Sequence, residues 1–379
     1  MAKGTIYRSE SKALSDEKTG TKVRQVTHHP SIHHHPFYYL PCFDDSQQRL
    51  FFVSHRTGRP EIFAEIQDTG ELVQFTEHEG LNEWSLHPSH DGRYAYFTTD
   101  RGAWRVNTET LEEEELFNFG EVAVRDKGMV GASMGTTTLS HDDTFWAIPI
   151  KVGDVYRFYL ITTATGKWDV ITEHISIGHP EFHPSDNSLL RFAGPFYDRI
   201  WVINRDGSGK RLVYRRKAYR GHPVRKEWIV HETWRPGSRE IITTNWPHGV
   251  IGIDIDTGET RKVCSFNAWH PAINRQGNLM CADTTFPDRG LQLFSPLDGV
   301  GEPQTLCLPK SSNEGAHWKT QYCPYDDGPV QVYAPQHTHP HPCFSPDGHQ
   351  LIFTSDRSGD AQVYVAMLAP FVLRTPDAG

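Results

Sequence analysis

Short apolar runs alternate with polar turns along the whole chain. The clearest unit begins with the turn Pro346-Asp347-Gly348 and continues with an apolar run at 351–354, a polar turn, and a second apolar run at 362–365. Runs of this length, rich in β-branched and aromatic residues and bounded by Gly, Pro, Asp and Ser, are typical of strands. The pattern therefore predicts antiparallel hairpins.

The same unit recurs along the chain at spacings of roughly 40–50 residues. Its seven copies begin at 42–45, 86–92, 139–143, 182–186, 234–237, 270–274 and 344–348. A repeat of about 40–45 residues with four strands is a propeller blade. We therefore predict an all-β fold, a seven-bladed β-propeller that forms a single domain over residues 1–379. The acidic run at 111–115 is interpreted as a turn and strand edge rather than as a helix start.

The expected structure of the two ends of the chain follows from the need to close the ring of blades. A propeller has no free sheet edge only when its ring is closed. Residues 22–27 resemble the last strand of a blade and precede the first full copy. We expect this N-terminal strand to complete the seventh blade as its outer strand. Residues 1–15 are then a polar lead-in, and residues 374–379 a frayed tail.

Composition excludes several classes of protein. Lys and Arg number 38 and Asp and Glu number 47, which gives a net charge of −9. This excess of acid argues against nucleic acid as a partner. No apolar run approaches the ~18 residues of a membrane span, so no membrane partner is expected. The polar N-terminus has no signal-peptide pattern, so the default location is cytoplasmic, as a monomer or weak homo-oligomer. The six cysteines form no CxxC pair and are expected to be reduced.

Histidine is the compositional feature that bears on function, because the chain contains 22 of them. In a propeller the first strand of each blade lines the central channel. Histidines precede several of the predicted blades, namely His34, His179, His231, His270, His339 and His341. Ring geometry would bring such residues together although they lie far apart in sequence.

The sharpest local motif is Gln336-x-x-His339-Pro340-His341. On a strand, residues i and i+2 point to the same face, so His339 and His341 are expected to point together. Gln336 could join them through the bend that opens the strand. With His270 one blade away, neutral imidazoles and an amide oxygen suit a divalent transition metal. Mn²⁺ fits this mixed N/O set, and Zn²⁺ or Ni²⁺ are alternatives.

Other candidates are given a simpler interpretation. The histidine-rich run at 27–35 is metal-like in composition, but His28, His29 and His33 are interpreted as residues of a solvated loop. His337 has the parity of His339 but is placed outside the coordination sphere. Three aspartates are interpreted as turn formers, not as catalytic acids: Asp91, Asp142 and Asp347.

Several segments together resemble a known family, the oligogalacturonate lyases of polysaccharide lyase family 22. The most specific match is Gln336-x-x-His339-Pro340-His341-Pro342 with the turn and strand that follow it. The other matching segments are 34–43, 178–180, 197–208, 230–234 and 270–280. The resemblance covers most of the chain and is best over residues 178–365.

The resemblance implies a seven-bladed propeller that cleaves short α-1,4-linked galacturonides by metal-assisted β-elimination in pectin degradation. It implies an Mn²⁺ ion and assigns its ligands by motif as His270, Gln336, His339 and His341. It implies His231 as the catalytic base and Arg199 as its catalytic cationic partner. His34 and His179 are assigned to substrate binding. The chain departs from the family at Pro335, where a basic residue is expected, and in a longer segment between 319 and 336.

Two alternatives stay open. One is a lyase that acts on another uronate oligosaccharide. The other is a non-catalytic binding propeller similar to TolB, because the repeat unit alone does not decide function. The cationic residues of the predicted connection between blades 4 and 5 are either a local attraction for a polyanionic substrate or a solvated loop; they are Arg216, Arg220, Arg225 and Lys226.

Overall fold

The structure is a computed structural model that describes residues 2–120, 134–297, 302–313, 315–328, 330 and 335–368. Two compact units are present. Unit 1 comprises Met1–Glu10 and His29–Leu212, and unit 2 comprises Ser11–His28 and Val213–Gly379. The tail predicted at 374–379 lies outside the described residues.

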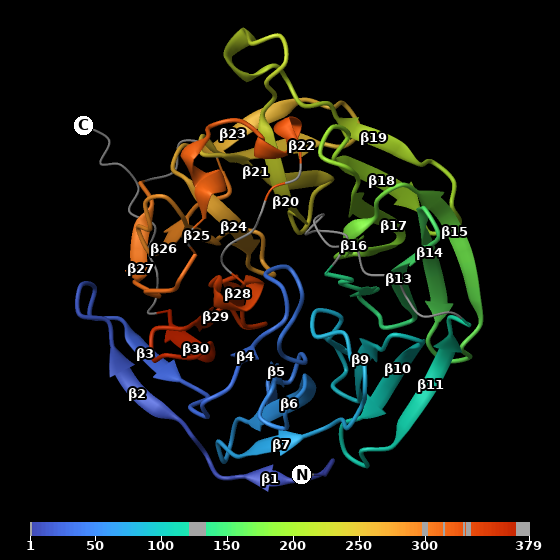
Figure 1. The fold of residues 1–379 in the computed structure, drawn as a ribbon, viewed down its shortest axis with the longest axis vertical. Helices are drawn as coiled ribbons and strands as arrows, with labels where there is room; N and C mark the ends of the chain where they lie inside the picture. Colours follow the sequence, from blue (N-terminus) through green and yellow to red (C-terminus); the bar gives the residue numbers. More distant parts are fainter. Residues whose placement is uncertain are drawn as a thin grey trace. The chain divides into compact units, whose positions relative to one another are not determined.

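Unit 1 is built from antiparallel strands (Figure 1). Its strands are β1 (Ile6–Tyr7), β4 (His33–His34), β5 (Arg49–Ser54), β6 (Glu61–Ile66), β7 (Leu72–Gln74), β8 (His87–Pro88), β9 (Tyr94–Thr98), β10 (Gly102–Asn107), β11 (Glu113–Asn118), β12 (Thr138–Leu139), β13 (Phe145–Val152), β14 (Val155–Thr162), β15 (Trp168–His174), β16 (Gly178–His183), β17 (Asp186–Ala193), β18 (Ile200–Asn204) and, at the boundary, β19 (Arg211–Tyr214).

Unit 2 also consists of strands, with four short 3-10 helices in the described residues. Its strands are β2 (Lys12–Ser15), β3 (Lys22–Gln25), β20 (Trp228–Trp234), β21 (Glu240–Trp246), β22 (Gly249–Asp254), β23 (Thr260–Cys264), β24 (Ala268–Ile273), β25 (Met280–Thr284), β26 (Leu291–Phe294), β27 (Gln304–Cys307), β28 (Cys343–Phe344), β29 (Gln350–Ser355) and β30 (Gln362–Met367). Its helices are η1 (Tyr219–Gly221), η2 (Ala316–Lys319), η3 (Pro324–Asp327) and η4 (Gln336–Thr338).

The strands form seven sheets, one for each predicted repeat. Five sheets have four strands, and two have five: β1 is added to β4–β7, and β3 and β2 are added to β28–β30. In six sheets four consecutive strands form an antiparallel meander, as in the order β20-β21-β22-β23, whereas in the seventh sheet β28, β29 and β30 are followed by β3. These are the blades of a seven-bladed β-propeller, so the predicted all-β fold class is confirmed. The acidic run leads into β11, as its interpretation as a strand edge required.

The N-terminal residues take part in two sheets. β3 pairs with β30, with Val23 opposite Ala366, as predicted for the strand that completes the seventh blade. β2 then pairs with β3, so β3 is not the outer strand. β1 pairs with β7. The expectation that residues 1–15 are only a polar lead-in is therefore wrong. A sheet edge offers unpaired backbone groups to any extended segment, and β2 is exposed along its length, so no apolar pattern marked it.

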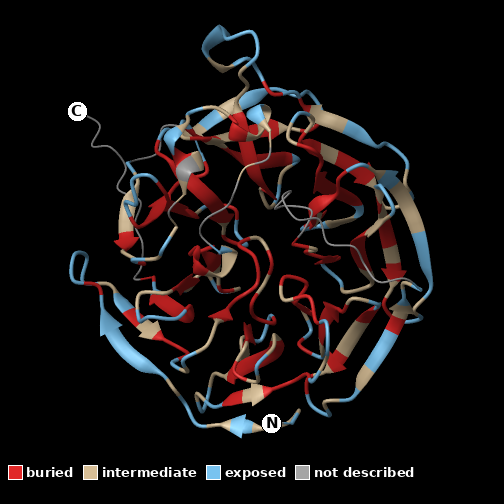
Figure 2. Ribbon diagram, in the orientation of Figure 1, coloured by how far each residue is buried: buried red, intermediate tan, exposed pale blue. Residues whose placement is uncertain are grey.

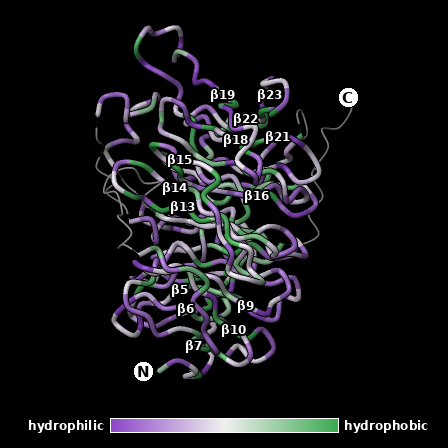
Figure 3. Tube along the Cα trace, turned by 90° about the vertical axis from the view of Figure 1, so that its right-hand side faces the viewer, coloured by the Kyte–Doolittle hydropathy of each residue, from purple (hydrophilic) through white to green (hydrophobic). Residues whose placement is uncertain are grey.

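Burial follows the alternation of side chains along the strands. The middle strands of the sheets are largely buried, whereas outer strands such as β2 and β15 are mostly exposed or half-buried (Figure 2). Hydrophilic residues gather in the connections at the strand ends (Figure 3). All six cysteines are free, as expected. No helix among the described residues has the length and apolar character needed to cross a membrane.

The blade turns have a shared local chemistry. In the turn after β28, the Ser345 hydroxyl donates to Oδ1 of Asp347 over 2.6 Å, and the same oxygen accepts the backbone N–H of His349. Asp91 and Asp142 are held in the same way by Ser89 and Ser140. These aspartates close Asx turns, which agrees with their interpretation as turn formers.

Candidate metal and catalytic site

Three histidines of unit 2 meet in one buried cluster, which we call the first cluster: His270, His339 and His341. One ring nitrogen of each lies within 4.8 Å of the others, and all three side chains are buried. The rings of His270 and His341 are 4.0 Å apart between centroids, and that of His339 lies 5.8 Å from His270. The structure thus brings together three of the four predicted metal ligands.

The local backbone that converges His339 and His341 differs from the predicted strand. Gln336 lies in η4, and His339 follows it in an extended conformation with φ −73° and ψ 143°. His341 has φ +46°, and strand β28 begins only at Cys343. The prediction that His339 and His341 point together is confirmed, but its reason is wrong, because neither residue lies in a strand. A left-handed residue is costly for a non-glycine side chain, and its presence at His341 is typical of a functional position.

Gln336 is tied to the first cluster through its backbone. The Nε2–H of His341 donates to the carbonyl oxygen of Gln336 over 3.0 Å. This bond fixes the tautomer in which the lone pair of His341 is on Nδ1. Ligation by the side-chain amide of Gln336 stays a prediction.

A buried carboxylate, which the sequence gave no reason to single out, orients His270. Asp283 on β25 accepts the Nδ1–H of His270 at Oδ2 over 2.8 Å and its backbone N–H at Oδ1 over 2.7 Å. Burial raises the pKa of Asp283 to about 7, although the bond from the His270 backbone lowers it. A carboxylate on the far nitrogen is the usual support of a metal-binding histidine, and it leaves Nε2 of His270 as the ligand atom.

The donor set of the first cluster fits a metal ion. His339 is 3% exposed, and neither of its ring nitrogens has a hydrogen-bond partner among the described residues. Leaving buried polar atoms unsatisfied costs free energy, and a cation would satisfy one of them. Burial lowers the pKa of His339 to about 3, with His270 acting in the same direction. The ring is therefore neutral at physiological pH, which is the form that binds metals.

His231 lies beside this cluster, also in unit 2. Its ring centroid is 4.2 Å from that of His270, and its side chain is nearly buried. The Nδ1–H donates to the carbonyl oxygen of Trp269 over 2.7 Å. A carbonyl only accepts, so Nε2 carries the lone pair. A buried imidazole with an oriented basic nitrogen is suited to accept a proton.

Three of the predicted histidines lie at the same kind of irregularity in strand pairing. The pairing of the first strand of a blade with the second shifts register across His179 in β16, His231 in β20 and His270 in β24. Such β-bulges re-aim side chains and are frequent at active sites. His179 and His231 also have positive φ values of 45° and 55°. Sequence periodicity placed these histidines on inner strands but did not reveal the bulges.

Arg199 and His179 meet within unit 1. Nη2 of Arg199 donates to Nδ1 of His179 over 3.3 Å, and the guanidinium lies 5.3 Å from the ring centroid of Phe196. Arg199 is 5% exposed and comes just before β18 rather than within it. Arg199 and His231 belong to different units, so their predicted partnership stays a prediction.

The histidine run near the N-terminus is more buried than expected. His33 and His34 form β4 and, with His35, are at most 1% exposed. The interpretation of His33 as a loop residue is therefore wrong, whereas His28 is exposed. His33 pairs with Ser54 of β5, so its burial follows from sheet formation.

Two of the four basic residues predicted in the connection between β19 and β20 form ion pairs within unit 2. Arg216 pairs with Asp326 over 2.7 Å, and Arg225 pairs with Asp327. Both acids belong to η3. Arg216 and Arg225 therefore do not present free charge to a polyanion, and for Arg220 and Lys226 both interpretations stay open.

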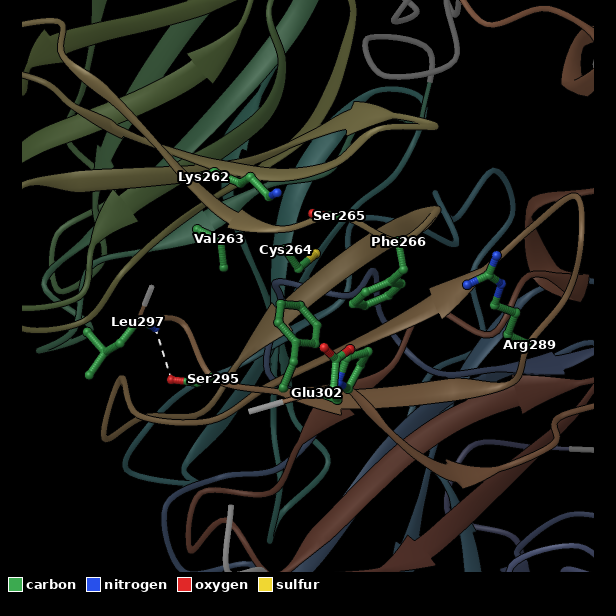
Figure 4. A pocket seen from close by; sticks show the side chains of 11 residues that line it. Lys262, Val263, Cys264, Ser265, Phe266, Arg289, Ser295, Leu297 and Glu302 are labelled. Carbon is green, nitrogen blue, oxygen red and sulfur yellow. Dashed lines mark hydrogen bonds between the residues drawn. The ribbon is translucent and has the colours of Figure 1, made fainter. Parts of the chain in front are cut away.

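Unit 2 also contains a pocket that shares no residue with the first cluster. A cavity of about 380 Å³ is lined by residues of β23, by Phe294 at the end of β26, and by residues of the adjoining connections; they include Lys262, Arg289 and Glu302 (Figure 4). None of the predicted site residues lines it. The chemistry of the site is therefore assigned from the histidines rather than from this hollow.

Fold and site together define a seven-bladed β-propeller with a buried three-histidine cluster flanked by a basic imidazole. The sequence model of the oligogalacturonate lyase family matches residues 1–372. The chain belongs to the oligogalacturonate lyase family, and the resemblance seen in the sequence is confirmed.

Curated relatives carry the same family name, and solved structures have the same fold. The chain is 27% identical to the oligogalacturonate lyase of Dickeya dadantii (strain 3937), over 97% of this chain and 98% of that protein. It is 27% identical to the oligogalacturonide lyase of Pectobacterium atrosepticum, with the same coverage. An oligogalacturonate lyase structure from Vibrio parahaemolyticus aligns with a TM-score of 0.77 and 24% identity, over 97% of this chain and 99% of that one. Another, described as oligogalacturonate lyase in complex with manganese, aligns with a TM-score of 0.78 and 24% identity, over 98% and 99%.

Proposed function

We propose that this protein is an oligogalacturonate lyase that cleaves short α-1,4-linked galacturonides by β-elimination. The observation that carries the proposal is the first cluster with His231 beside it. A non-catalytic binding propeller would not require three converging neutral imidazoles next to an oriented basic nitrogen. Family membership over residues 1–372 supports the same activity.

The metal in this proposal is Mn²⁺, held by His270, His339, His341 and Gln336. Neutral imidazole nitrogens and an amide oxygen suit it, and a relative of similar fold is described as a manganese complex. Zn²⁺ and Ni²⁺ remain alternatives with the same donor set. When bound, the ion stabilises the negative charge that develops on the uronate carboxylate as the α-proton leaves.

His231 is the proposed base. The C5–H bond of the uronate breaks and its proton moves to Nε2 of His231. The electron pair forms the C4–C5 double bond as the C4–O4 glycosidic bond breaks, and the leaving oxygen takes up a proton. The bond to the Trp269 carbonyl keeps the accepting nitrogen oriented, and a positioned base of this kind contributes about 10²–10⁴-fold in rate.

Arg199 is proposed as the catalytic cation that accompanies His231. Its planar guanidinium can bind a substrate carboxylate through two parallel hydrogen bonds. His179, which accepts a bond from Arg199, and His34 are proposed to bind the substrate. A cytoplasmic location and a monomeric or weakly oligomeric state remain expectations.

The direct test is to follow the absorbance of the enoyl uronate while digalacturonate is incubated with the manganese-loaded protein. The proposal predicts a continuous rise that chelation stops and manganese restores. No rise with digalacturonate, but a rise with a glucuronan or rhamnogalacturonan fragment, would replace galacturonate by another uronate. No rise with any of these substrates would leave the binding platform as the better account.

A further inference from the structure

A second group of metal-type ligands lies in unit 1, and we call it the second cluster: His34, His55 and Glu83. One ligand atom of each lies within 4.8 Å of the others. His34 ends β4, His55 follows β5, and Glu83 lies in the connection between β7 and β8. Three separate segments of the chain therefore converge on one point.

His34 is held in one orientation. It is 1% exposed, and its Nδ1–H donates to the carbonyl oxygen of His35 over 3.1 Å. The indole of Trp84 packs against it, with ring centroids 4.3 Å apart and planes inclined by 31°. The tautomer with the proton on Nδ1 leaves a lone pair on Nε2. A backbone carbonyl on the far nitrogen is a common support of a metal-binding imidazole.

The oriented lone pair faces a negative charge. Nε2 of His34 lies 3.4 Å from Oε2 of Glu83 and makes no hydrogen bond among the described residues. Two electron pairs that face each other in a buried place repel, unless a proton or a cation lies between them. His55 directs its Nε2 to the same Glu83 oxygen over 2.8 Å. Burial raises the pKa of Glu83, but interactions with His34 and His55 outweigh it and hold that pKa well below its usual range.

The separations are close to those around a tetrahedral ion. Ligand atoms about 2.0–2.1 Å from zinc lie roughly 3.4 Å from one another. The His34–Glu83 distance has this value already, and the 2.8 Å between His55 and Glu83 must widen by about half an ångström. The His55 and Glu83 side chains are 25% and 28% exposed, so solvent reaches the cluster from one side. That side can admit an ion and supply a water as fourth ligand.

Nearby charge does not oppose a cation. Arg56 follows His55 in sequence, but its Nη2 pairs with Oε1 of Glu10 over 2.9 Å. Two neutral imidazoles and one carboxylate would leave a bound divalent ion with a net charge of only about +1. Two histidines and one glutamate with an open fourth position form a well-known zinc set.

We propose that His34, His55 and Glu83 bind a second divalent transition cation, with zinc as the preferred ion. The ion would connect the beginning of the first blade to the connection that leads to the second. This proposal does not depend on lyase activity, because every ligand lies in unit 1 and none belongs to the first cluster. If the test supports it, this role replaces the substrate contact proposed for His34 above.

The test counts zinc bound by the full-length protein after chelation and equilibrium dialysis. A His339→Ala/His341→Ala variant removes the first cluster, so its remaining zinc reports on the second. We expect one equivalent to remain in that variant and to be lost when Glu83→Gln or His55→Ala is added. His78→Ala is the matched control, because His78 meets Glu113 over 3.0 Å as a single ion pair, and it should keep the equivalent.

A second measurement separates loss of the site from loss of the fold. Zinc should raise the melting temperature of the His339→Ala/His341→Ala variant, and Glu83→Gln should abolish that rise while circular dichroism stays native. The proposal is overturned if the variant without the first cluster binds no zinc, or if both Glu83→Gln and His55→Ala keep it. In that case a proton shared between the imidazoles and Glu83 accounts for the geometry. Neither outcome bears on the galacturonate assay.

Discussion

The first and second clusters differ in burial and in the place of their carboxylate. In the first cluster all three imidazoles are buried, and the carboxylate of Asp283 stands behind His270 rather than among the ligand atoms. In the second cluster the carboxylate of Glu83 is itself a ligand atom and is partly open to solvent. A divalent cation at the first cluster would keep more of its charge to act on a substrate, whereas Glu83 in the second cluster would reduce the net charge to about +1. The comparison indicates a chemical role for one and a tethering role for the other.

The largest effect is expected from removing ligands of the first cluster. His339→Ala and His341→Ala should each lose most of the bound manganese, and with it lyase activity down to background. The reason is that two remaining imidazoles bind a divalent ion far less firmly than three. Metal analysis and the enoyl-uronate assay measure this, with His78→Ala, a histidine of neither cluster, as the control that leaves manganese in place. Wild-type manganese stoichiometry in both variants would refute the ligand assignment.

The base should be separable from the metal. His231→Ala should keep its manganese and fold and lose about 10²–10⁴-fold in kcat, the contribution of a positioned general base. His248→Ala, a histidine of the same unit that stacks on Tyr219, serves as the control. A variant with near wild-type kcat would move the role elsewhere, and His179 is the next candidate.

Whether unit 1 contributes to the chemistry can be tested at Arg199. Arg199→Lys keeps the charge but loses the planar two-point geometry. If Arg199 positions the substrate, melting temperature should stay near that of the wild type and kcat/KM should fall by about 10²-fold, as for a small misplacement. A large drop in melting temperature with intact activity per folded molecule would instead make Arg199 structural.

The carboxylate behind the first cluster should have a smaller effect than the ligands. Asp283→Asn keeps an acceptor for His270 but removes the negative charge, and supporting groups of this kind are worth about 10–100-fold in metal affinity. Manganese titration measures the change. Asp288→Asn is the control, because Asp288 is an exposed acid of the same blade that accepts the backbone N–H of Gly290 instead. Equal affinities in the two variants would show that Asp283 does not support the metal ligand.

The last prediction concerns stability rather than metal binding or catalysis, and it involves a buried histidine of neither cluster, His87. Burial lowers the pKa of His87 from 6.5 to about 4. Between these values the unfolded chain binds the proton and the folded chain does not, so stability falls as pH drops through this window, by at most about 3 kcal/mol. Urea unfolding of wild type and His87→Gln on both sides of the window measures this. An equally steep loss in His87→Gln would assign the pH dependence to other groups.

The fold could be predicted from the sequence because each blade repeats a similar pattern of turn residues and apolar runs. Turn residues such as Asp347 and the alternation along β29 and β30 act over a few residues, and turn residues of the same kinds (Asp, Asn, Gly, Pro or Ser) recur with apolar runs in the other copies. The exposed strand β2 was missed because it pairs through its backbone and carries no apolar pattern.

The site was only partly predictable for a related reason. Equivalent positions in the repeats singled out His231 and His270, and the spacing of the terminal motif singled out His339 and His341. Asp283, His55 and Glu83 could not be found in this way, because each contacts its partner through tertiary packing and lies in an unremarkable stretch of sequence. The left-handed backbone at His231 and His341 is likewise imposed by the folded surroundings rather than by local preference.

The pairing of Val23 with Ala366 has a consequence for how the protein is made. At a synthesis rate of about 5–20 residues per second, β3 leaves the ribosome tens of seconds before β30 exists. During that interval the N-terminal strand has no place in its final sheet, and the nascent chain carries it as an open edge that other chains could join. If synthesis stops shortly before β30, the released chain lacks only a short segment. Two strand edges then stay unpaired, one on β29 and one on β3.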